Sequence, residues 1–181
     1  MFDPTPNIDH IMLSEAQIKA RVAELAEQVT HDYQDKDLIV VSVLKGAFVF
    51  MADFVRNVKL NLSLDFMSAS SYGSGTSSSG KLNVRMDIKA DVKGKDVLII
   101  EDILDSGVTL SYVKQHIADM GAASVKVCTL LDKPERRVAD ISADYVGFAI
   151  ANEFVVGYGL DFAEDYRNLP YIGVLKPECY S

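Results

Sequence analysis

Three carboxylates gather where an apolar run ends, in the stretch VLIIEDILDSGVTL at residues 97–110. Glu101 and Asp102 follow the apolar residues directly, and Asp105 comes three positions later. A turn into a helix needs only one Asp or Ser to satisfy its free backbone donors, so three acids exceed that need. Because adjacent carboxylates repel each other, they are best tolerated when a metal ion or an electron-poor carbon lies between them. The stretch therefore predicts a site for positive charge, with an acidic helix cap as the plain alternative.

The elements that must position these acids alternate between strand and helix. The expected helices span residues 15–33, 47–55 and 108–120, and a capping box of Ser14 and Gln17 opens the first. The expected strands span residues 38–44, 60–66, 82–88, 96–101, 124–131, 143–150, 155–158 and 171–175. Because the runs at 38–44 and 96–101 are continuously apolar, as in a sheet covered on both faces, this order predicts an α/β fold with a mainly parallel central sheet flanked by helices.

Two of the expected strands differ from the others. Residues 60–66 and 82–88 alternate strictly between apolar and polar, which predicts half-exposed strands that could pair antiparallel. The stretch SYGSGTSSSGK between them has little capacity to pack and predicts a mobile loop. In open α/β sheets, ligands lie beyond the carboxyl ends of the strands. This rule puts Lys45, residues 101–109 and residues 132–133 along one rim.

Composition narrows the class of protein. The 181 residues, 49% hydrophobic and 24% charged, suit one compact domain with a substantial core. The net charge of -8 weighs against a broad nucleic-acid-binding face, which needs clustered Lys and Arg, so no nucleic-acid partner is expected. Cys128 and Cys179 are too differently placed for a disulfide framework, which favours the cytoplasm. No apolar stretch approaches the roughly 20 residues of a membrane span, so no membrane partner is expected.

The acidic stretch also resembles a known motif. V-L-I-I-E-D-I-L-D-S-G-V-T is similar to the phosphoribosyl-pyrophosphate signature of type I phosphoribosyltransferases, and the other motifs resemble the hypoxanthine-guanine branch of that family. Those motifs are V-L-K-G at residues 43–46, S-Y at 71–72, L-L-D-K-P at 130–134 and F-V-V-G-Y-G-L-D at 154–161, with Arg167 following at the family's spacing. The resemblance spans nearly the whole chain. Val108 and Ala47, where some relatives carry a lysine and a second glycine, look like bacterial-type variation.

The resemblance implies a purine-salvage enzyme. The family joins hypoxanthine or guanine to C1 of phosphoribosyl pyrophosphate, giving IMP or GMP and pyrophosphate, with Mg²⁺ as cofactor. It implies the type I phosphoribosyltransferase fold as a single domain over residues 1–181, with a small hood from the N-terminal segment and residues from about 150 to 181. A flexible flap at about residues 70–82 would include Ser71 and Tyr72 and would exclude water when closed. A homodimer or homotetramer is expected by the same analogy.

The resemblance assigns roles to the acidic stretch. Glu101 and Asp102 would hold the ribose hydroxyls, directly or through water around Mg²⁺, and Asp105 would act as the general base that takes a proton from N7 of the purine. Free N–H groups at a helix start bind anions, so the ribose 5′-phosphate is expected in the loop of Asp105, Ser106, Gly107, Val108 and Thr109. An ordinary N-cap is the alternative for the hydroxyls there.

For the purine, the resemblance implies Lys133, Phe154, Val155 and Asp161. An ammonium can only donate, so Lys133 suits O6 of hypoxanthine or guanine and opposes the amino group of adenine. Phe154 would stack on the ring, while Val155 would meet its edge through main-chain groups. Asp161 would lie near C2 and contact the metal through water. Without the resemblance, a loop lysine reads as surface and these strand residues read as core.

For pyrophosphate, the resemblance implies Lys45, Gly46 and Arg167. Relatives place a cis peptide before the lysine. The planar donor fork of Arg167 would complete the grip on the anion, with a surface salt bridge as the alternative.

Two other classes of function were weighed against the enzyme. Some phosphoribosyltransferase-like proteins bind phosphoribosyl pyrophosphate only to control transcription, and tight binding without turnover would identify that class. The acidic charge and the retained Asp105 and Lys133 favour the enzyme. A metal enzyme built on His10, His31 and His116 is less favoured, because these residues are scattered without a ligand spacing.

Overall fold

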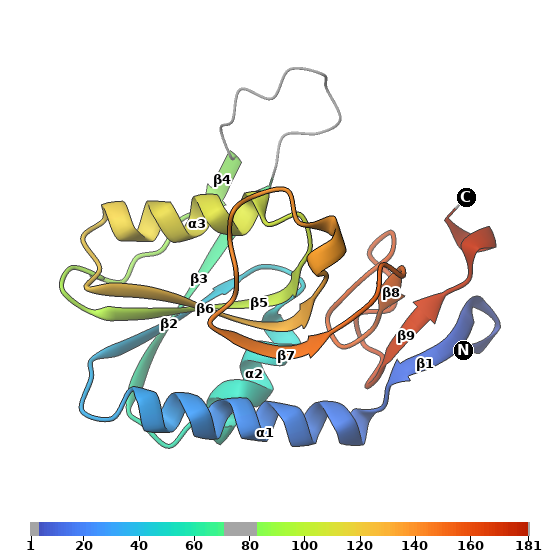
Figure 1. The fold of residues 1–181 in the computed structure, drawn as a ribbon, viewed down its shortest axis with the longest axis horizontal. Coiled ribbons are helices and arrows are strands. Elements are labelled where there is room, and N and C mark those ends of the chain that lie inside the picture. Colours follow the sequence, from blue (N-terminus) through green and yellow to red (C-terminus); the bar gives the residue numbers. More distant parts are fainter. Residues whose placement is uncertain (1–3, 71–82, 181) are drawn as a thin grey trace.

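The fold is built around a central sheet (Figure 1). The computed structural model describes residues 4–70 and 83–180. Within these residues the sheet has six strands in the order β4-β3-β2-β5-β6-β7. They are β2 (Leu38–Val43), β3 (Leu62–Ser70), β4 (Asn83–Met86), β5 (Asp96–Leu104), β6 (Ser124–Asp132) and β7 (Tyr145–Ala149). All neighbours pair in parallel except β3 and β4, which are antiparallel. The α/β fold and the antiparallel pair predicted from the sequence are therefore confirmed.

Helices cover both faces of this sheet. They are α1 (Glu15–Asp32), α2 (Phe48–Asn57) and α3 (Val108–Asp119). In Figure 1, α1 and α2 lie on one side of the sheet and α3 lies on the other. Leu38 and Val40 of β2 pack in the core that contains buried residues of α1 and α2, whereas Ile39 and Val41 pack in the core that contains those of α3. Both sets of alternate side chains are buried, which explains why β2 is continuously apolar.

Local sequence signals account for the first helix. The Ser14 hydroxyl accepts from the backbone N–H of Gln17, and the Gln17 side chain accepts from the backbone N–H of Ser14 at 2.9 Å. This is the predicted capping box. Ile18, Val22 and Leu25 recur at helical spacing and are fully buried against the sheet, so burial of one apolar stripe fixes the rest of the helix.

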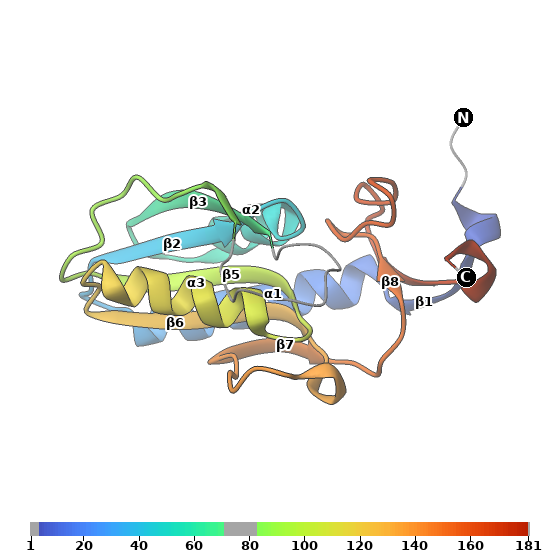
Figure 2. The same cartoon turned by 90° about the horizontal axis from the view of Figure 1, so that it is seen from above.

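A second, smaller sheet forms the hood. Its strands are β1 (Ile8–Leu13), β9 (Ile172–Leu175) and β8 (Val155–Val156), antiparallel in the order β1-β9-β8. Figure 2 shows β1 and β8 beside the end of the main sheet. Strand β1 was not predicted, because IDHIML is largely exposed and lacks a clear alternation. The strand predicted at 155–158 ends after two residues, where Gly157 turns the chain at a φ of 100°. Short 3₁₀ helices are η1 (Thr5–Asn7), η2 (Pro134–Arg136) and η3 (Pro177–Cys179).

The edge of the main sheet differs in detail from the prediction. Strand β3 begins at Leu62 rather than at residue 60, and β4 ends at Met86 rather than at residue 88. Leu64 and Phe66 are 48% and 39% exposed, so the half-exposed character predicted for this strand is confirmed. Ile88 lies beyond β4 and is buried.

Across residues 4–70 and 83–180, no helix combines the length and hydrophobicity that crossing a membrane requires. Cys128 is buried in β6 and Cys179 is partly exposed, and both thiols are free, as predicted.

Candidate functional site

The rim predicted from the sequence lies at the carboxyl ends of three adjacent strands. Strand β5 pairs in parallel with β2 on one side and with β6 on the other. The carboxyl ends of β2, β5 and β6 lie at the same edge of the sheet (Figure 2). Lys45 follows β2, the acidic residues end β5 and Lys133 follows β6, so all three belong to this edge. The backbone N–H of Lys133 donates to the carbonyl of Leu104 at 3.0 Å, which joins the ends of β5 and β6.

Glu101 and Asp102 form an acidic pair at the end of β5, in which Asp102 is buried and Glu101 is half-buried. Asp102 is 9% exposed, and its Oδ1 atom accepts from the backbone N–H of Ile103 at 2.8 Å. The Oε2 atom of Glu101 is buried without a hydrogen-bond partner. Burial raises the pKa of Glu101 well above its usual range, and the Asp102 charge raises it further. Burial likewise raises the pKa of Asp102, although hydrogen bonds oppose this shift.

This acidic pair fits Mg²⁺. An unpaired buried carboxylate oxygen beside a second carboxylate offers the hard oxygen ligands that this ion prefers, and a cation would relieve their repulsion. In the part of the chain that the structure describes, no group of three or more His, Cys, Asp or Glu side chains is arranged to hold a metal. The acids could therefore supply only part of the coordination shell, which is usual for Mg²⁺ bound together with phosphates and water.

Gly46 packs directly against Asp102. A Cβ atom built on Gly46 would lie 1.6 Å from Oδ2 of Asp102, so only glycine leaves room for the carboxylate. Gly159 approaches from the other side, where an added Cβ would lie 2.1 Å from the carbonyl oxygen of Gly46. The Leu44–Lys45 peptide just before this turn is cis, as the family resemblance implied. Gly46 thus lets the turn after β2 approach the end of β5, and Gly159 lets the segment after β8 approach that turn.

The loop predicted to bind phosphate opens α3. Gly107 is the N-cap residue, with a φ of 79°, and no side-chain hydrogen bond caps the helix. The alternative of an ordinary hydroxyl cap therefore does not describe this helix start. Val108 is exposed, and its N–H lies 3.5 Å from the Ser106 hydroxyl, at the limit of hydrogen bonding. Backbone donors at a helix start without a cap provide an anion site.

A cavity of about 400 Å³ brings the predicted base Asp105 together with three of the four predicted purine-binding residues, while Asp161 does not line it. Asp105, Lys133, Phe154 and Val155 all line it. Lys133 is only 7% exposed, its Nζ atom donates to the carbonyl of Glu153 at 2.6 Å, and burial lowers its pKa. A buried ammonium at a cavity wall offers a directed donor to a ligand.

Phe154 presents an aromatic surface in the same cavity. Its ring is 37% exposed and stacks on Tyr180, with centroids 4.7 Å apart and planes at 21°. Phe162 meets it edge-on at 5.6 Å. Neighbouring aromatic side chains therefore fix the orientation of the ring. Because the side chain is partly exposed, the alternative that Phe154 is a core residue does not hold. Val155, by contrast, is buried in β8 and offers mainly its backbone.

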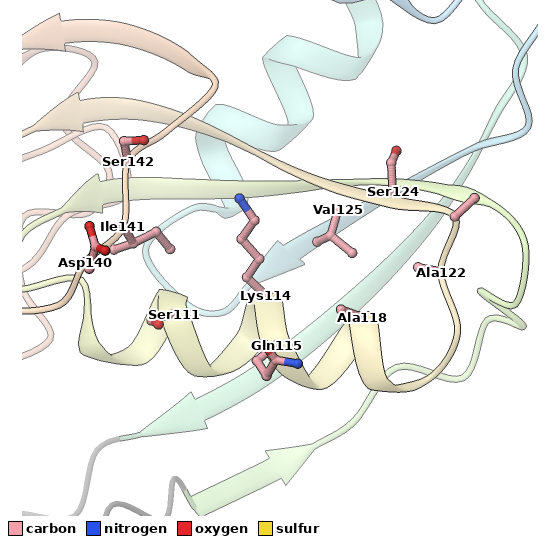
Figure 3. A pocket seen from close by; sticks show the side chains of 11 residues that line it. Ser111, Lys114, Gln115, Ala118, Ala122, Ser124, Val125, Asp140, Ile141 and Ser142 are labelled. Atoms are coloured by element: carbon pink, nitrogen blue, oxygen red, sulfur yellow. The ribbon is translucent and has the colours of Figure 1, made fainter.

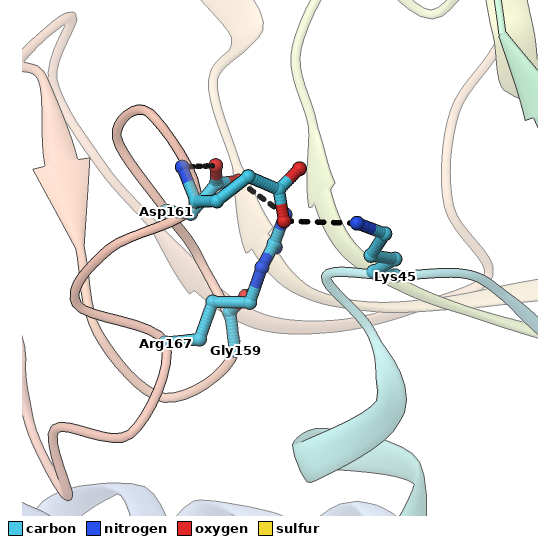
Figure 4. Close-up of polar contacts among 5 residues, drawn as sticks. Lys45, Gly159, Asp161 and Arg167 are labelled. Carbon is cyan, nitrogen blue, oxygen red and sulfur yellow. Dashed lines mark hydrogen bonds and ion pairs between the residues drawn. The ribbon is translucent and has the colours of Figure 1, made fainter.

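Lys45, Asp161 and Arg167 form one charged cluster (Figure 4). Arg167 pairs with Asp161 at 2.8 Å and donates to the carbonyl of Gly159 at 2.8 Å. Glu164 joins the two cations, because its Oε2 atom accepts from Lys45 at 2.9 Å and lies 3.5 Å from Arg167. The hydrogen bond and charge of Lys45 lower the pKa of Glu164. Arg167 is 19% exposed and its Nε atom is buried without a hydrogen-bond partner, so it is not a simple surface salt bridge.

Asp161 is held differently from the acidic pair. One of its carboxylate oxygens pairs with Arg167, and the other accepts from the backbone N–H of Glu164 at 2.9 Å. Its role near the metal and the purine therefore stays a prediction. The predicted flap residues Ser71 and Tyr72 lie outside the described residues.

Arg136, Tyr180 and Glu164 are among the residues that contact the predicted site without having been predicted. Arg136 pairs with the carboxylate of Asp105 at 2.8 Å and lines the cavity, as does Tyr180, while Glu164 joins Lys45 and Arg167. A signal existed for Arg136, because Pro134 favours a tight turn that returns a residue toward the rim. No sequence signal identified Glu164 or Tyr180.

A second hollow, of about 520 Å³, lies between α3 and the start of β6 (Figure 3). Its walls carry small and polar side chains, among them Ser111, Lys114 and Ser142. None of the predicted site residues lines it, so the predicted chemistry belongs to the rim.

Comparisons with known proteins agree with this geometry. A family model described as a phosphoribosyl transferase domain matches residues 12–163. The hypoxanthine-guanine phosphoribosyltransferase of Bacillus subtilis (strain 168) is 52% identical over 174 residues, which are 96% of this chain and 97% of that protein. The enzyme of the same description from Streptococcus pneumoniae (strain ATCC BAA-255 / R6) is 50% identical, over 97% of each chain.

A solved structure and a longer relative complete the comparison. The crystal structure of a hypoxanthine phosphoribosyltransferase from Staphylococcus aureus has a TM-score of 0.94 and 48% identity, covering 98% of this chain and 96% of that one. The bifunctional protein TilS/HprT of Listeria monocytogenes is 54% identical over 97% of this chain, which spans only 27% of that protein's length.

Proposed function

This chain belongs to the phosphoribosyl transferase domain family, and from that premise we propose that it is a hypoxanthine-guanine phosphoribosyltransferase of purine salvage. It transfers the 5-phosphoribosyl group from phosphoribosyl pyrophosphate to N9 of hypoxanthine or guanine, giving IMP or GMP and pyrophosphate. The observation that carries the proposal is the cavity in which Asp105 and the buried Lys133 lie together at the rim. A base and a directed donor are what a 6-oxopurine requires.

Asp105 and Lys133 act on different atoms of the purine. Asp105 accepts the proton from N7 as N9 attacks C1 of the ribose. Lys133 donates to O6, and at adenine it would meet the donors of an amino group, so adenine is rejected. The exposed ring of Phe154 supports stacking on the purine, and the backbone of Val155 supports contact with its edge. Asp161 lies near C2 of the bound base.

Glu101 and Asp102 bind the ribose hydroxyls and, with Asp161, would hold Mg²⁺. The bound ion would offset the negative charge of pyrophosphate as it leaves. The raised pKa values of the pair support this role, because Mg²⁺ or the positive charge that develops at C1 would offset the desolvation and repulsion that oppose ionisation of these carboxyls.

Phosphate groups occupy two anion sites. The ribose 5′-phosphate binds at the start of α3, in the loop of Asp105, Ser106, Gly107, Val108 and Thr109. Pyrophosphate binds Lys45, the backbone of Gly46 and Arg167, and it competes with Glu164, whose carboxylate contacts both cations. The flap with Ser71 and Tyr72 closes over the site and limits hydrolysis at C1.

The chain acts as one domain over residues 1–181 and assembles as a homodimer or homotetramer in the cytoplasm. Exposed apolar side chains support assembly, since Phe48 of α2, Leu64 and Phe66 of β3 and Met86 of β4 are each 37% or more exposed. Free thiols at Cys128 and Cys179 support a reducing compartment.

The first test measures nucleotide formation from phosphoribosyl pyrophosphate with hypoxanthine, guanine, xanthine and adenine in parallel, in magnesium buffer. Product from hypoxanthine or guanine and none from adenine is expected, and it would also rank the accepted bases. Equal rates with adenine would refute the role of Lys133. Tight binding of phosphoribosyl pyrophosphate without product from any base would identify the regulatory class instead.

A further inference from the structure

Arg137 lies beside the rim but does not line the purine cavity, and its side chain is only 17% exposed. Its Nε atom donates to the carbonyl of Asp105 at 3.0 Å, and its Nη2 atom donates to the carbonyl of Leu104 at 3.2 Å. Its Nη1 atom donates to the carbonyl of Ile141 at 2.6 Å. The carboxylate of Asp132 pairs with the same guanidinium and balances its charge.

These contacts join two strand ends that carry the proposed chemistry. Leu104 ends β5 and Asp105 follows it, whereas Asp132 ends β6 and Lys133 follows it. The carbonyl of Leu104 accepts both from Arg137 and from the backbone N–H of Lys133. One planar guanidinium therefore ties the peptide groups around the proposed base to the strand end from which the proposed purine donor emerges.

The stem of Arg137 also supports the phosphate loop. A Cβ atom built on Gly107 would lie 2.9 Å from Cδ of Arg137 and 2.6 Å from Cγ2 of Ile141, so the loop packs closely on both side chains. The carbonyl of Ser106 accepts from the backbone N–H groups of Val138 and Ala139 at 2.9 and 3.0 Å. Residues 137–139 thus pack against residues 105–107 and hydrogen-bond to their carbonyl groups.

From these contacts we infer that Arg137 is a positioning residue for the transfer reaction. It sets the orientation of the peptide groups at Leu104 and Asp105, and hence where the Asp105 carboxylate and the N–H groups of the phosphate loop point relative to Lys133. The inference rests on the proposed function and adds a residue that touches no substrate. A lysine cannot replace it, because one ammonium lacks the planar fork that reaches three carbonyls at once.

The test replaces Arg137 by lysine, which keeps the charge that balances Asp132. We expect Arg137→Lys to fold, to lose about 10²-fold in kcat and to bind phosphoribosyl pyrophosphate more weakly by calorimetry, since a shift of about 1 Å in a reacting group has an effect of this size. Arg56→Lys on α2 is the matched control, because Arg56 is 79% exposed and pairs only loosely with Asp53, at 3.5 Å. The control should keep wild-type kcat, KM and affinity.

A purely structural role would give a different result. If Arg137→Lys has a lower Tm but wild-type kcat, KM and affinity for phosphoribosyl pyrophosphate while folded, the inference is overturned. If the lysine variant does not fold, Arg137→Gln keeps part of the stem and one donor, and the same comparison applies to it. A wild-type chain that makes no nucleotide would overturn the proposed function, and calorimetry with phosphoribosyl pyrophosphate would still decide whether Arg137 positions the loop.

Discussion

Gly46→Ala adds one methyl group where the turn after β2 meets the acidic pair. The new Cβ would lie 1.6 Å from Oδ2 and 2.6 Å from Cγ of Asp102, far inside contact distance. Gly46 is not in the left-handed region of φ, so alanine can adopt its backbone conformation. The predicted effect is therefore steric and acts on one named carboxylate.

The size of the effect follows from the surroundings of Asp102. This side chain is 9% exposed and holds a backbone hydrogen bond of 2.8 Å, so it cannot move aside freely. Overpacking of a buried site destabilises by about 1–3 kcal/mol, and the loss of a hydrogen bond adds on the order of 1 kcal/mol. In a chain of 181 residues, about 1 kcal/mol shifts Tm by about 2–4 °C, so a fall of roughly 4–16 °C is expected.

Gly46→Ala should also lower catalytic activity by more than its loss of folded protein explains. Displacing Asp102 moves a proposed ribose and Mg²⁺ ligand, so kcat/KM for phosphoribosyl pyrophosphate should drop by about 10²-fold and the Mg²⁺ concentration for half-maximal rate should rise. Thermal unfolding and initial rates across a magnesium titration measure both. Gly94→Ala is the control, since Gly94 has a φ of 73° and nothing within 4 Å of an added Cβ. It should show backbone strain of about 1–2 kcal/mol with unchanged kinetics.

A double-mutant cycle isolates the contact itself. If the methyl group overlaps the Asp102 carboxylate, Asp102→Ala should remove most of the stability loss caused by Gly46→Ala, without restoring turnover. The coupling energy between the two substitutions should then exceed about 0.5 kcal/mol. An additive cycle, or a Gly46→Ala protein with wild-type Tm and wild-type magnesium dependence, would refute the reasoning.

Three further predictions concern single carboxylates and one ammonium. Asp105→Asn should fold and bind phosphoribosyl pyrophosphate but turn over about 10²–10⁴-fold more slowly, because the proton acceptor is lost; undiminished turnover would exclude it as the base. Lys133→Ala should weaken hypoxanthine binding by about 1.5–3 kcal/mol, the range for a charged hydrogen bond, and calorimetry showing unchanged affinity would contradict this. Although burial opposes ionisation of Asp65, three backbone N–H groups at 2.6–2.7 Å hold its pKa below the usual range. Ionised Asp65 should therefore add to the free energy of unfolding above the unfolded-state pKa of about 3.9. This stabilisation should be lost as the pH falls through the lower folded-state pKa. Asp65→Asn should lower the free energy of unfolding by about 1–3 kcal/mol at pH 7 and by much less in acid; denaturant titrations giving the same difference at both pH values would argue against it.

The parts of the fold that the sequence predicted are those with local causes. The capping box at Ser14 and the buried stripe of α1 are encoded within one helix, and the continuous apolar runs of β2 and β5 identify strands covered on both faces. The rim followed from topology alone, because parallel strands bring their carboxyl ends to one edge. Residues 101–109 and Lys133 lie at one edge because β5 and β6 are parallel neighbours, which requires no knowledge of side-chain contacts.

The features that the sequence did not predict depend on distant partners. Glu164 meets Lys45 across 119 positions, at a place where Ala163, Glu164 and Tyr166 all adopt positive φ values. A polar turn such as DFAEDYR carries no pattern that forecasts this geometry. Strand β1 likewise exists because β9 offers it an edge, and its own sequence is too exposed and irregular to indicate a strand.

The hood also sets an order in which the proposed site can be completed. Val155 pairs with Val174, and the carbonyl of Phe154 accepts from the backbone N–H of Leu175 at 2.8 Å, so the purine side of the cavity depends on β9. The phosphate loop needs β5, α3, β6 and the contacts of residues 137–141, which follow one another in the chain before β9. During synthesis, β9 leaves the ribosome after the other strands described here, and its pairing with β1 closes a loop of more than 150 residues. A nascent chain can therefore form the phosphate loop before the purine side of the cavity is complete.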